Sequence, residues 1–121
     1  MAAAPRKLYK LKSFSRAAKK HGVSDQDLCD AAAELDESKG EDLGGGVWKK
    51  RLLKNQSRGI VLTRREAGWL FAEWYDKADQ VGLAPDELAL YRKAVKDIDQ
   101  LTREQVAKLL KDKWWIEVTC G

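Results

Sequence analysis

The spacing of apolar side chains changes along the first third of the chain, and each change predicts a different element. Residues 7–12 (KLYKLK) alternate apolar and cationic positions, which is the period of a half-buried strand. Residues 13–22 (SFSRAAKKHG) predict a short helix that ends at its glycine. A second helix is predicted over residues 24–35, because Ser24 can cap its first turn with Asp27 at the capping-box position.

Three strands are predicted in the middle of the chain, at residues 47–53, 60–63 and 69–75. The links between them are short and polar, which is typical of an antiparallel meander. The preceding residues 37–46 are rich in turn formers and are expected to be a connection, whose glycines let the chain turn tightly into the sheet. In the first strand, alternation places Val47, Lys49, Arg51 and Leu53 on one face, and Trp48, Lys50 and Leu52 on the other. Since both faces carry cations, we expect at least one of them to lie open to solvent.

The last third of the chain predicts two helices and then a short strand. Pro85 suits the first turn of a helix that has one apolar side. Thr102 and Gln105 form a capping box at the start of the next helix, and residues 114–118 (WWIEV) predict the strand. Together the elements predict an α+β fold, in which a small central antiparallel sheet is flanked by helices. The length predicts one domain over residues 1–121, with its core at about 8–118.

Composition argues against several classes of protein. No stretch approaches the roughly 18 apolar residues of a membrane helix, and the first residues lack the apolar segment of a secretory signal. Cys29 and Cys120 lie far apart with no paired spacing, which predicts reduced thiols in a cytosol. One histidine and two scattered cysteines cannot supply a tetrahedral metal site, so no metal and no cofactor are expected. His21 is expected to complement the dipole at a helix end, and not to act in catalysis.

Charge is distributed unevenly, although the net charge is only +4. The segment from Leu43 to Arg65 contains seven cations and no acid, whereas the rest of the chain is slightly acidic. Segregation of this kind indicates a polyanionic partner more strongly than a uniformly basic surface does. The alternative is a basic face that is merely solvated.

The same region could support cleavage of RNA without a metal. Such cleavage needs a base for the 2′-hydroxyl, cations for the charge that builds on phosphorus, and an acid for the leaving oxygen. The candidate catalytic residues are the cations Arg51 and Arg58 and the proton carriers Tyr75 and Lys77. The candidate RNA-binding residues are Lys49, Lys50, Lys54, Arg64 and Trp48. Trp69, Phe71 and Trp74 are expected to belong to the core more than to a stacking platform.

Several consecutive motifs resemble one family of small bacterial proteins. The stretches FSRAAKKHGVSDQDLCDAAAEL and DLGGGVWKKRLL are similar to the helical pair and the basic strand of RelE/HigB-type toxins, from toxin–antitoxin operons. SRGIVLTRR and LFAEWYDK are similar to the arginine-led central strand and the aromatic strand of that family. The resemblance covers about residues 8–118, and DLGGGVWKKR is its most specific part.

This resemblance implies a microbial ribonuclease-type fold and a toxin that cleaves messenger RNA, in many relatives on the translating ribosome. It also implies a cognate antitoxin that silences the protein, and a location in the bacterial cytoplasm. By position, Lys49, Lys50 and Arg51 match the basic strand, Arg58 the central arginine, Arg64 a following arginine, and Lys77 the lysine after the aromatic strand. Two other functions stay open: a non-catalytic module that binds nucleic acid or an acidic protein surface, and a toxin on the same fold that poisons gyrase.

Overall fold

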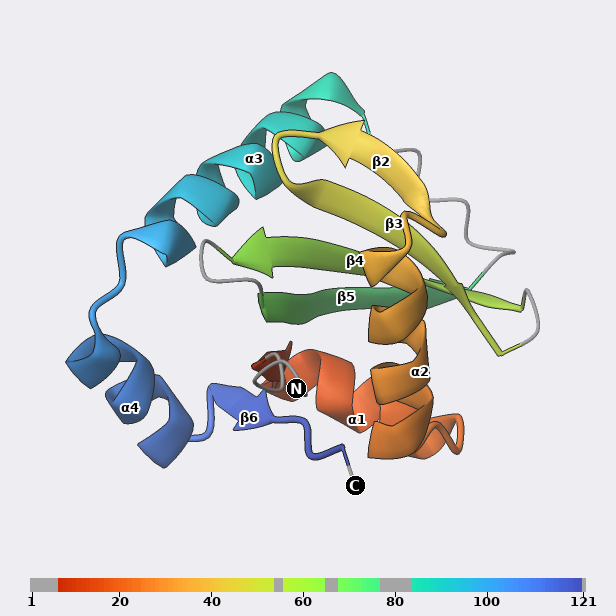
Figure 1. The fold of residues 1–121 in the computed structure, drawn as a ribbon, viewed down its shortest axis with the longest axis horizontal. Coiled ribbons are helices and arrows are strands. Elements are labelled where there is room, and N and C mark those ends of the chain that lie inside the picture. Colours follow the sequence, from red (N-terminus) through yellow and green to blue (C-terminus); the bar gives the residue numbers. More distant parts are fainter. Residues whose placement is uncertain (1–6, 54–55, 65–67, 77–83, 121) are drawn as a thin grey trace, which may run out of the picture.

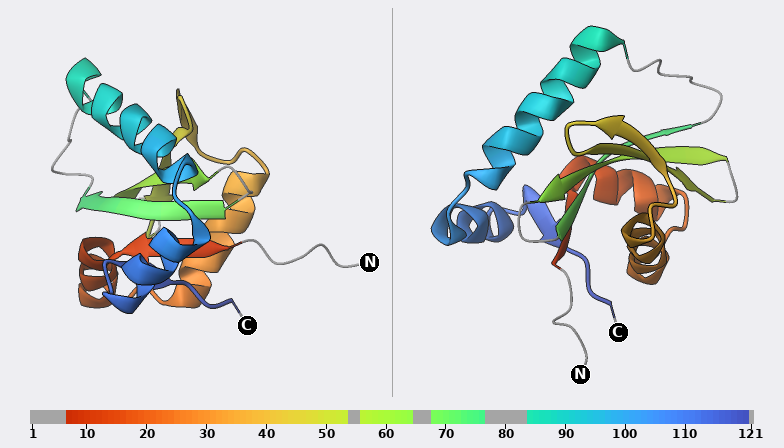
Figure 2. Two further views of the ribbon diagram at one scale, coloured as in Figure 1. Left: turned by 90° about the vertical axis from the view of Figure 1, so that its left-hand side faces the viewer. Right: turned by 45° about the horizontal axis from the view of Figure 1, so that its top comes forward.

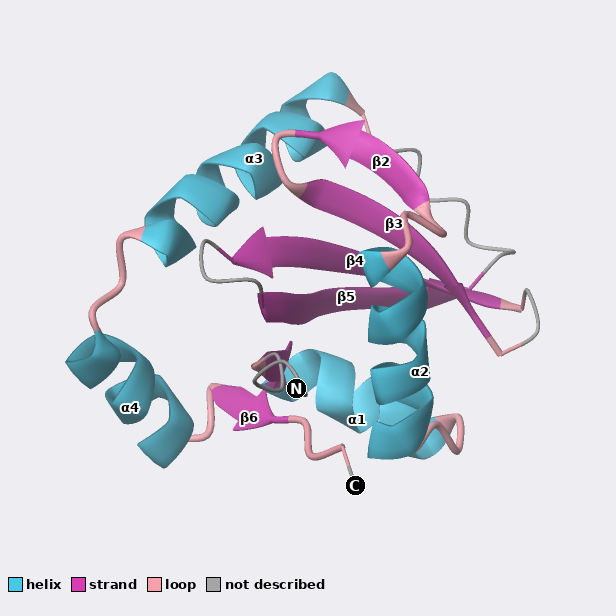
Figure 3. Cartoon of the chain, viewed as in Figure 1, coloured by secondary structure: helices cyan, strands magenta, loops and turns pink. Residues whose placement is uncertain are grey.

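Strands form one mixed sheet in the computed structural model, which describes residues 7–53, 56–64, 68–76 and 84–120. In chain order the elements are β1 (Leu8–Leu11), α1 (Lys12–Lys20), α2 (Asp25–Asp36), β2 (Glu41–Gly44), β3 (Val47–Leu52), β4 (Ser57–Arg64), β5 (Gly68–Asp76), α3 (Pro85–Asp99), α4 (Arg103–Lys111) and β6 (Trp115–Glu117). The strand order in the sheet is β2-β3-β4-β5-β1-β6, with β1 and β5 parallel and the other neighbours antiparallel. The predicted α+β fold, with a mostly antiparallel sheet flanked by helices, is confirmed (Figures 1 and 3).

The sheet separates two hydrophobic clusters, one on each face. On the first face, α1 and α2 supply buried side chains such as Phe14 and Leu28, which cluster with Val61 of β4. On the second face, α3 and α4 contribute Val95 and other apolar residues that cluster with the next β4 residue, Leu62. Figure 2 shows α1 and α3 on opposite sides of the sheet. Alternate residues of β4 therefore enter different cores, as the period of a strand buried on both faces requires.

Two helix starts have the capping boxes that the sequence predicts. The Ser24 hydroxyl accepts a hydrogen bond from the Asp27 amide at 3.2 Å, and the Ser24 amide donates to the Asp27 carboxylate at 2.9 Å. Thr102 and Gln105 make the same reciprocal pair at the start of α4, at 3.1 and 2.9 Å. Each box satisfies two backbone donors that a helix start otherwise leaves unpaired.

The residues before β3 differ from the prediction, because part of the expected connection is an edge strand. β2 pairs with β3 in an antiparallel hairpin, and Gly44, Gly45 and Gly46 form its turn with φ angles of 86°, 64° and 84°. An added Cβ at Gly46 would lie 2.5 Å from Oγ1 of Thr63, so the turn needs glycine for space as well as for its backbone. Arg92 of α3 donates hydrogen bonds to carbonyl oxygens at this turn and holds the helix against the hairpin.

The prediction of two reduced cysteines is wrong for this structure, because Cys29 and Cys120 form a disulfide with their Cα atoms 5.8 Å apart. The two residues are separated by 91 positions, so no local spacing pattern could reveal the pair. The last residues run back past β1 to reach α2, since the Val118 amide donates to the Leu8 carbonyl at 2.9 Å. The disulfide therefore ties the C-terminal segment to the second helix.

The cations of β3 differ in exposure, and the expected open face is the one that carries Arg51. Lys50 is buried and only 8% exposed, Lys49 is half-buried, and Arg51 is exposed. Leu53 also leaves the predicted alternation: it has a φ of 48° and packs on the α1–α2 side, away from the cluster that contains Val47.

No helix in the described residues is long and apolar enough to cross a lipid bilayer.

Candidate nucleic-acid interface

Three of the predicted site residues form one row across the central strands. Arg51 of β3 lies directly opposite Arg58 of β4, and Arg58 lies directly opposite Tyr75 of β5. Opposite residues of an antiparallel pair have Cβ atoms about 4.5–5.5 Å apart on the same face, and like charges there repel. The sheet therefore holds two guanidinium groups close together beside a tyrosine, an arrangement that an anion between them would stabilise.

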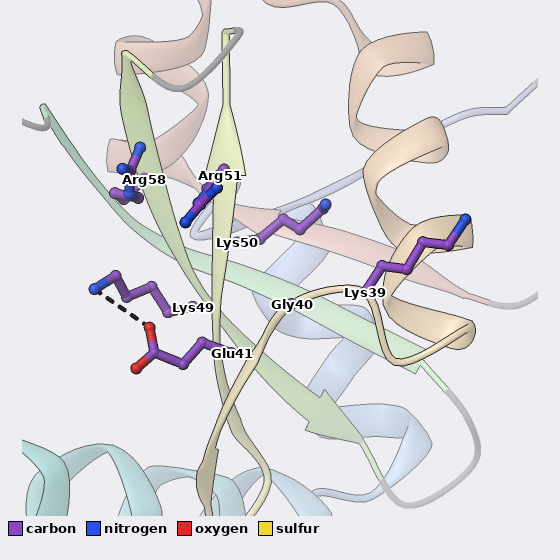
Figure 4. Close-up of a pocket in the computed structure, with 7 residues that line it drawn as sticks. All are labelled: Lys39, Gly40, Glu41, Lys49, Lys50, Arg51 and Arg58. Atoms are coloured by element: carbon purple, nitrogen blue, oxygen red, sulfur yellow. Dashed lines mark ion pairs between the residues drawn. The ribbon is translucent and has the colours of Figure 1, made fainter.

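The two arginines line an open cavity of about 580 Å³ at this end of the sheet. Figure 4 shows its lining, which consists of Lys39, Gly40, Glu41, Lys49, Lys50, Arg51 and Arg58. Five of these seven residues are cations and one is an acid, so the cavity has the charge that a phosphate group prefers. The structure thus joins Lys49, Arg51 and Arg58 in one concave basic surface, hereafter the basic cavity.

The three lysines of the basic cavity are already paired with acids. Nζ of Lys49 lies 3.4 Å from Glu41, Nζ of Lys39 lies 2.9 Å from Glu37, and Nζ of Lys50 lies 3.3 Å from Glu34. Each of these acids is more than half exposed. Ion pairs near the surface contribute little free energy, so a phosphate can compete with Glu41 for Lys49 and with Glu37 for Lys39, whereas Lys50 is buried beside Glu34.

Two predicted RNA-binding residues lie on the other face of β3. Trp48 is half-buried and places its ring edge-on to Trp69, with the ring centroids 6.0 Å apart. Lys50 extends toward Glu34 of α2, away from Arg58 (Figure 4). The structure therefore brings Lys50 only to the rim of the basic cavity, and it does not bring Trp48 there. The expectation that Trp69 and Phe71 belong to the core is confirmed, because they are 5% and 0% exposed.

Tyr75 is 9% exposed, and its hydroxyl has no hydrogen-bond partner in the described structure. Burial raises the pKa of Tyr75, against the lowering effect of the Arg58 guanidinium. The phenol is therefore neutral at pH 7, so it can donate a proton or a hydrogen bond but cannot serve as a base.

Arg64 lies at the opposite end of β4 from Arg58. The backbone of Arg64 pairs with Gly68, whereas that of Arg58 pairs with Tyr75. Six residues of strand span about 20 Å, so the two arginines cannot contact the same phosphate. Lys54 and Lys77, which the sequence also proposes for the site, lie outside the described residues.

His21 occupies the end of α1, as the sequence predicts, and it stacks on Trp74 with ring centroids 5.0 Å apart. Its Nε2 atom lies 4.0 Å from a carboxylate oxygen of Asp76. In the described ranges, no group of three histidine, cysteine, aspartate or glutamate side chains could hold a metal ion.

Sequence reasoning missed three residues of the basic cavity: Lys39, Gly40 and Glu41. They belong to the segment that was expected to be a connection, and they reach the cavity because β2 pairs with β3. The alternation of that strand is too short and too polar to distinguish it from a turn.

A comparison with protein-family models found one that matches residues 6–118, described as the RelE toxin of the RelE / RelB toxin–antitoxin system. Searches of curated proteins and of solved structures found no match.

Proposed function

Because the chain belongs to the RelE family of toxins from toxin–antitoxin systems, we propose that it is a metal-independent endoribonuclease. Its substrate is messenger RNA, cleaved in the bacterial cytoplasm in association with the ribosome. The observation that carries the proposal is the row Arg51–Arg58–Tyr75 beside the basic cavity. That row combines two groups that stabilise negative charge with one that donates a proton.

The chemistry starts with attack of a 2′-hydroxyl on the adjacent phosphorus. The hydroxyl passes its proton to a base, for which Lys77 in its neutral form is the candidate. The bond from phosphorus to the 5′-oxygen then breaks, and that oxygen takes up a proton. Arg58, with Arg51 opposite, stabilises the charge that grows on the phosphoryl oxygens in the transition state. Neutral Tyr75 is the candidate that donates a proton to the leaving oxygen, once the bound RNA has displaced the groups that bury its hydroxyl.

The remaining cations are assigned to binding. Lys49 lies beside the arginines in the basic cavity and is placed to contact a neighbouring phosphate. Arg64, at the far end of β4, contacts a phosphate further along the RNA, and Lys54 is the third candidate. Contacts of this kind position the RNA and make its binding depend on salt.

The proposal is tested by inducing the protein in bacteria and mapping the 5′ ends of transcripts. We expect new ends within coding sequences, and none when the induced protein carries Arg58→Ala. In vitro, initiation complexes of ribosome and messenger RNA are first formed and stabilised, and a chelator then removes free divalent ions. Cleavage of the messenger RNA in these complexes should persist. Growth arrest with DNA breaks and unchanged transcripts would contradict ribonuclease activity and indicate a gyrase poison. Unchanged transcripts with intact DNA would instead indicate a binding module.

Family membership also implies a cognate antitoxin. We propose that it silences the toxin by covering the basic cavity, since phosphate and an acidic segment of protein compete for the same cations. Co-expression with the antitoxin should then abolish the new transcript ends.

A further inference from the structure

A second cavity, of about 360 Å³, opens between α2 and the C-terminal segment that follows β6. Its lining includes Leu8 of β1, Ala32 and Ala33 of α2, and both cysteines of the disulfide, Cys29 and Cys120. Figure 1 shows the C-terminal segment running from β6 toward α2. None of the residues that line the basic cavity lines this one. We call it the disulfide cavity.

The two sulfur atoms of the disulfide differ in access. Cys29 is 9% exposed and belongs to the hydrophobic cluster on the α1–α2 side of the sheet, whereas Cys120 is exposed. A disulfide is broken by a thiolate that reaches one of its sulfur atoms, and the rate depends on access to that atom. An incoming thiolate is therefore expected to attack Cys120 and to release Cys29.

Contacts other than the disulfide hold the two cysteines close together. The buried Val118 donates from its amide to the Leu8 carbonyl at 2.9 Å, and the Thr119 amide donates to the Asp25 carboxylate of α2 at 3.3 Å. The Cα atoms of the cysteines are 5.8 Å apart, within the usual disulfide range of about 4.4–6.8 Å. The bond between them can therefore break and form again without a large movement of the backbone.

The lining of the disulfide cavity carries both signs of charge. Lys7 supplies an ammonium group, Asp36 and Glu117 supply carboxylates, and all three residues are exposed. A small thiol that has a carboxylate and an ammonium group of its own, such as cysteine or glutathione, matches this lining. The volume lies at the lower end of the range of about 300–1,000 Å³ that is typical of small-molecule sites.

We propose that Cys120 is a site of reversible S-thiolation, at which a small thiol of the amino-acid type occupies the disulfide cavity and replaces Cys29 as the partner of the Cys120 sulfur. The bound thiol then prevents the bond that ties the C-terminal segment to α2. The site needs only the cytoplasmic location that accompanies the proposed function, because disulfides in that compartment are usually transient or redox-sensing. It does not depend on whether the protein cleaves RNA.

The exchange needs no reagent other than the thiol. The sulfur of the incoming thiolate forms a bond with Sγ of Cys120, and the bond between the two cysteines breaks. Its electron pair stays on Sγ of Cys29, which takes up a proton. A second molecule of the same thiol can attack the sulfur of the bound one, which releases a symmetrical disulfide and leaves Cys120 as a thiol. Two thiol molecules thus supply the two electrons of the full reduction.

The first test compares the two single-cysteine variants of the full-length protein, Cys29→Ser and Cys120→Ser. Each is incubated with oxidised glutathione, and the mixed disulfide is followed by mass spectrometry. In folded protein, Cys120 should form the adduct at least about tenfold faster than Cys29, because only Cys120 is exposed. In urea the two rates should become similar, which shows that the fold causes the difference. Equal rates in folded protein would overturn the proposal.

A steric variant tests the cavity itself in the Cys29→Ser background. Ala33→Trp fills the disulfide cavity and should lower the equilibrium amount of glutathione adduct about fivefold or more. Ala89→Trp makes the same change at an exposed position of α3 outside the cavity and should leave the amount unchanged. Circular dichroism establishes that both variants are folded. Equal amounts of adduct in the two tryptophan variants would show that the cavity does not receive the thiol.

A third measurement tests the class of thiol. Cysteine and the uncharged mercaptoethanol are compared at equal thiolate concentration, and cysteine should give about two- to fivefold more adduct at equilibrium. The double variant Lys7→Gln, Glu117→Gln should remove this preference, and Lys111→Gln, Glu104→Gln, at exposed sites outside the cavity, should keep it. Equal amounts of the two adducts on the parent would refute the assigned ligand class. Cleavage of RNA is assayed on the same samples, so that failure of the thiol site and failure of the ribonuclease proposal are told apart.

Discussion

Arg58 and Tyr75 lie directly opposite each other in the β4–β5 pairing. Of the two, Tyr75 is buried in the hydrophobic cluster on the α3–α4 side of the sheet, and Arg58 is not. The guanidinium thus stands at the border between the apolar core and the basic cavity. An electrostatic contact at such a border is stronger than one in open water, because fewer water molecules screen it. We therefore expect substitution of Arg58 to act mainly on the rate of cleavage, and substitution of Tyr75 to act on cleavage and on the pH dependence of stability.

Arg58→Ala is expected to lower kcat for RNA cleavage by about 10²–10³, which is typical when one group that stabilises a transition-state charge is removed. Its affinity for RNA should change little, since Lys49 and other cations still hold flanking phosphates. Single-turnover kinetics and a binding titration with the same RNA separate the two effects. Arg64→Ala is the comparison variant: it should keep kcat, weaken binding, and reduce the slope of log K against log salt by about one contact. Full cleavage by Arg58→Ala would refute the site assignment.

Tyr75→Phe should reduce cleavage while leaving the protein as stable as before at pH 7. The lost hydroxyl is buried without a partner in the described structure, so its removal costs no hydrogen bond. Because burial raises the pKa of Tyr75 above its ordinary 10.0, the unfolded chain ionises first, and this residue's contribution to stability is lost as pH rises above 10.0. The phenylalanine variant should therefore be less sensitive to alkali. Urea titrations at pH 7 and above pH 10 measure both effects, and a large loss of stability at pH 7 would contradict them.

Asp25→Asn should destabilise the fold at neutral pH by about 1–3 kcal/mol, because it leaves the buried Lys10 ammonium without its carboxylate at 2.8 Å. Burial acts to raise the pKa of Asp25, but the Lys10 and Thr119 hydrogen bonds outweigh it and hold the pKa below the ordinary 3.8. This stability is present above pH 3.8 and is lost as pH falls through the lower, folded-state pKa. The difference between parent and variant in urea should therefore shrink in acid. Asp30→Asn, an exposed change on the same helix, is the control and should show neither effect.

Reduction of the Cys29–Cys120 disulfide should lower the free energy of unfolding by about 2–5 kcal/mol, since the bond closes a long loop in the unfolded chain. Cys29→Ser and Cys120→Ser should each reproduce that loss without reductant, and dithiothreitol should then have no further effect on either variant. Thermal melts with and without dithiothreitol provide the measurement. A parent melt that reductant leaves unchanged would show that the disulfide does not form in solution.

Local signals in the sequence predicted most elements correctly, and pairings between distant residues account for what they missed. The capping boxes at Ser24 and Thr102 and the alternation of residues 7–12 depend on near neighbours, so they could be recognised directly. The strand β2 gains its hydrogen bonds from β3, and Cys120 meets Cys29 only through the folded sheet. For the candidate site, too, contacts between adjacent strands could be predicted from the sequence, and contacts that depend on a distant helix could not. Two candidate cations, Arg51 and Arg58, meet as expected for adjacent strands, whereas the turn of Lys50 toward Glu34 depends on where α2 lies.

The position of β1 between β5 and β6 has a consequence for synthesis of the chain. The ribosome makes β1 before both strands that flank it: β5 follows β4 in the chain, and β6 follows α4. The nascent protein can pair β1 on one side once β5 has been made, but it cannot pair β1 on both sides until β6 has also been made.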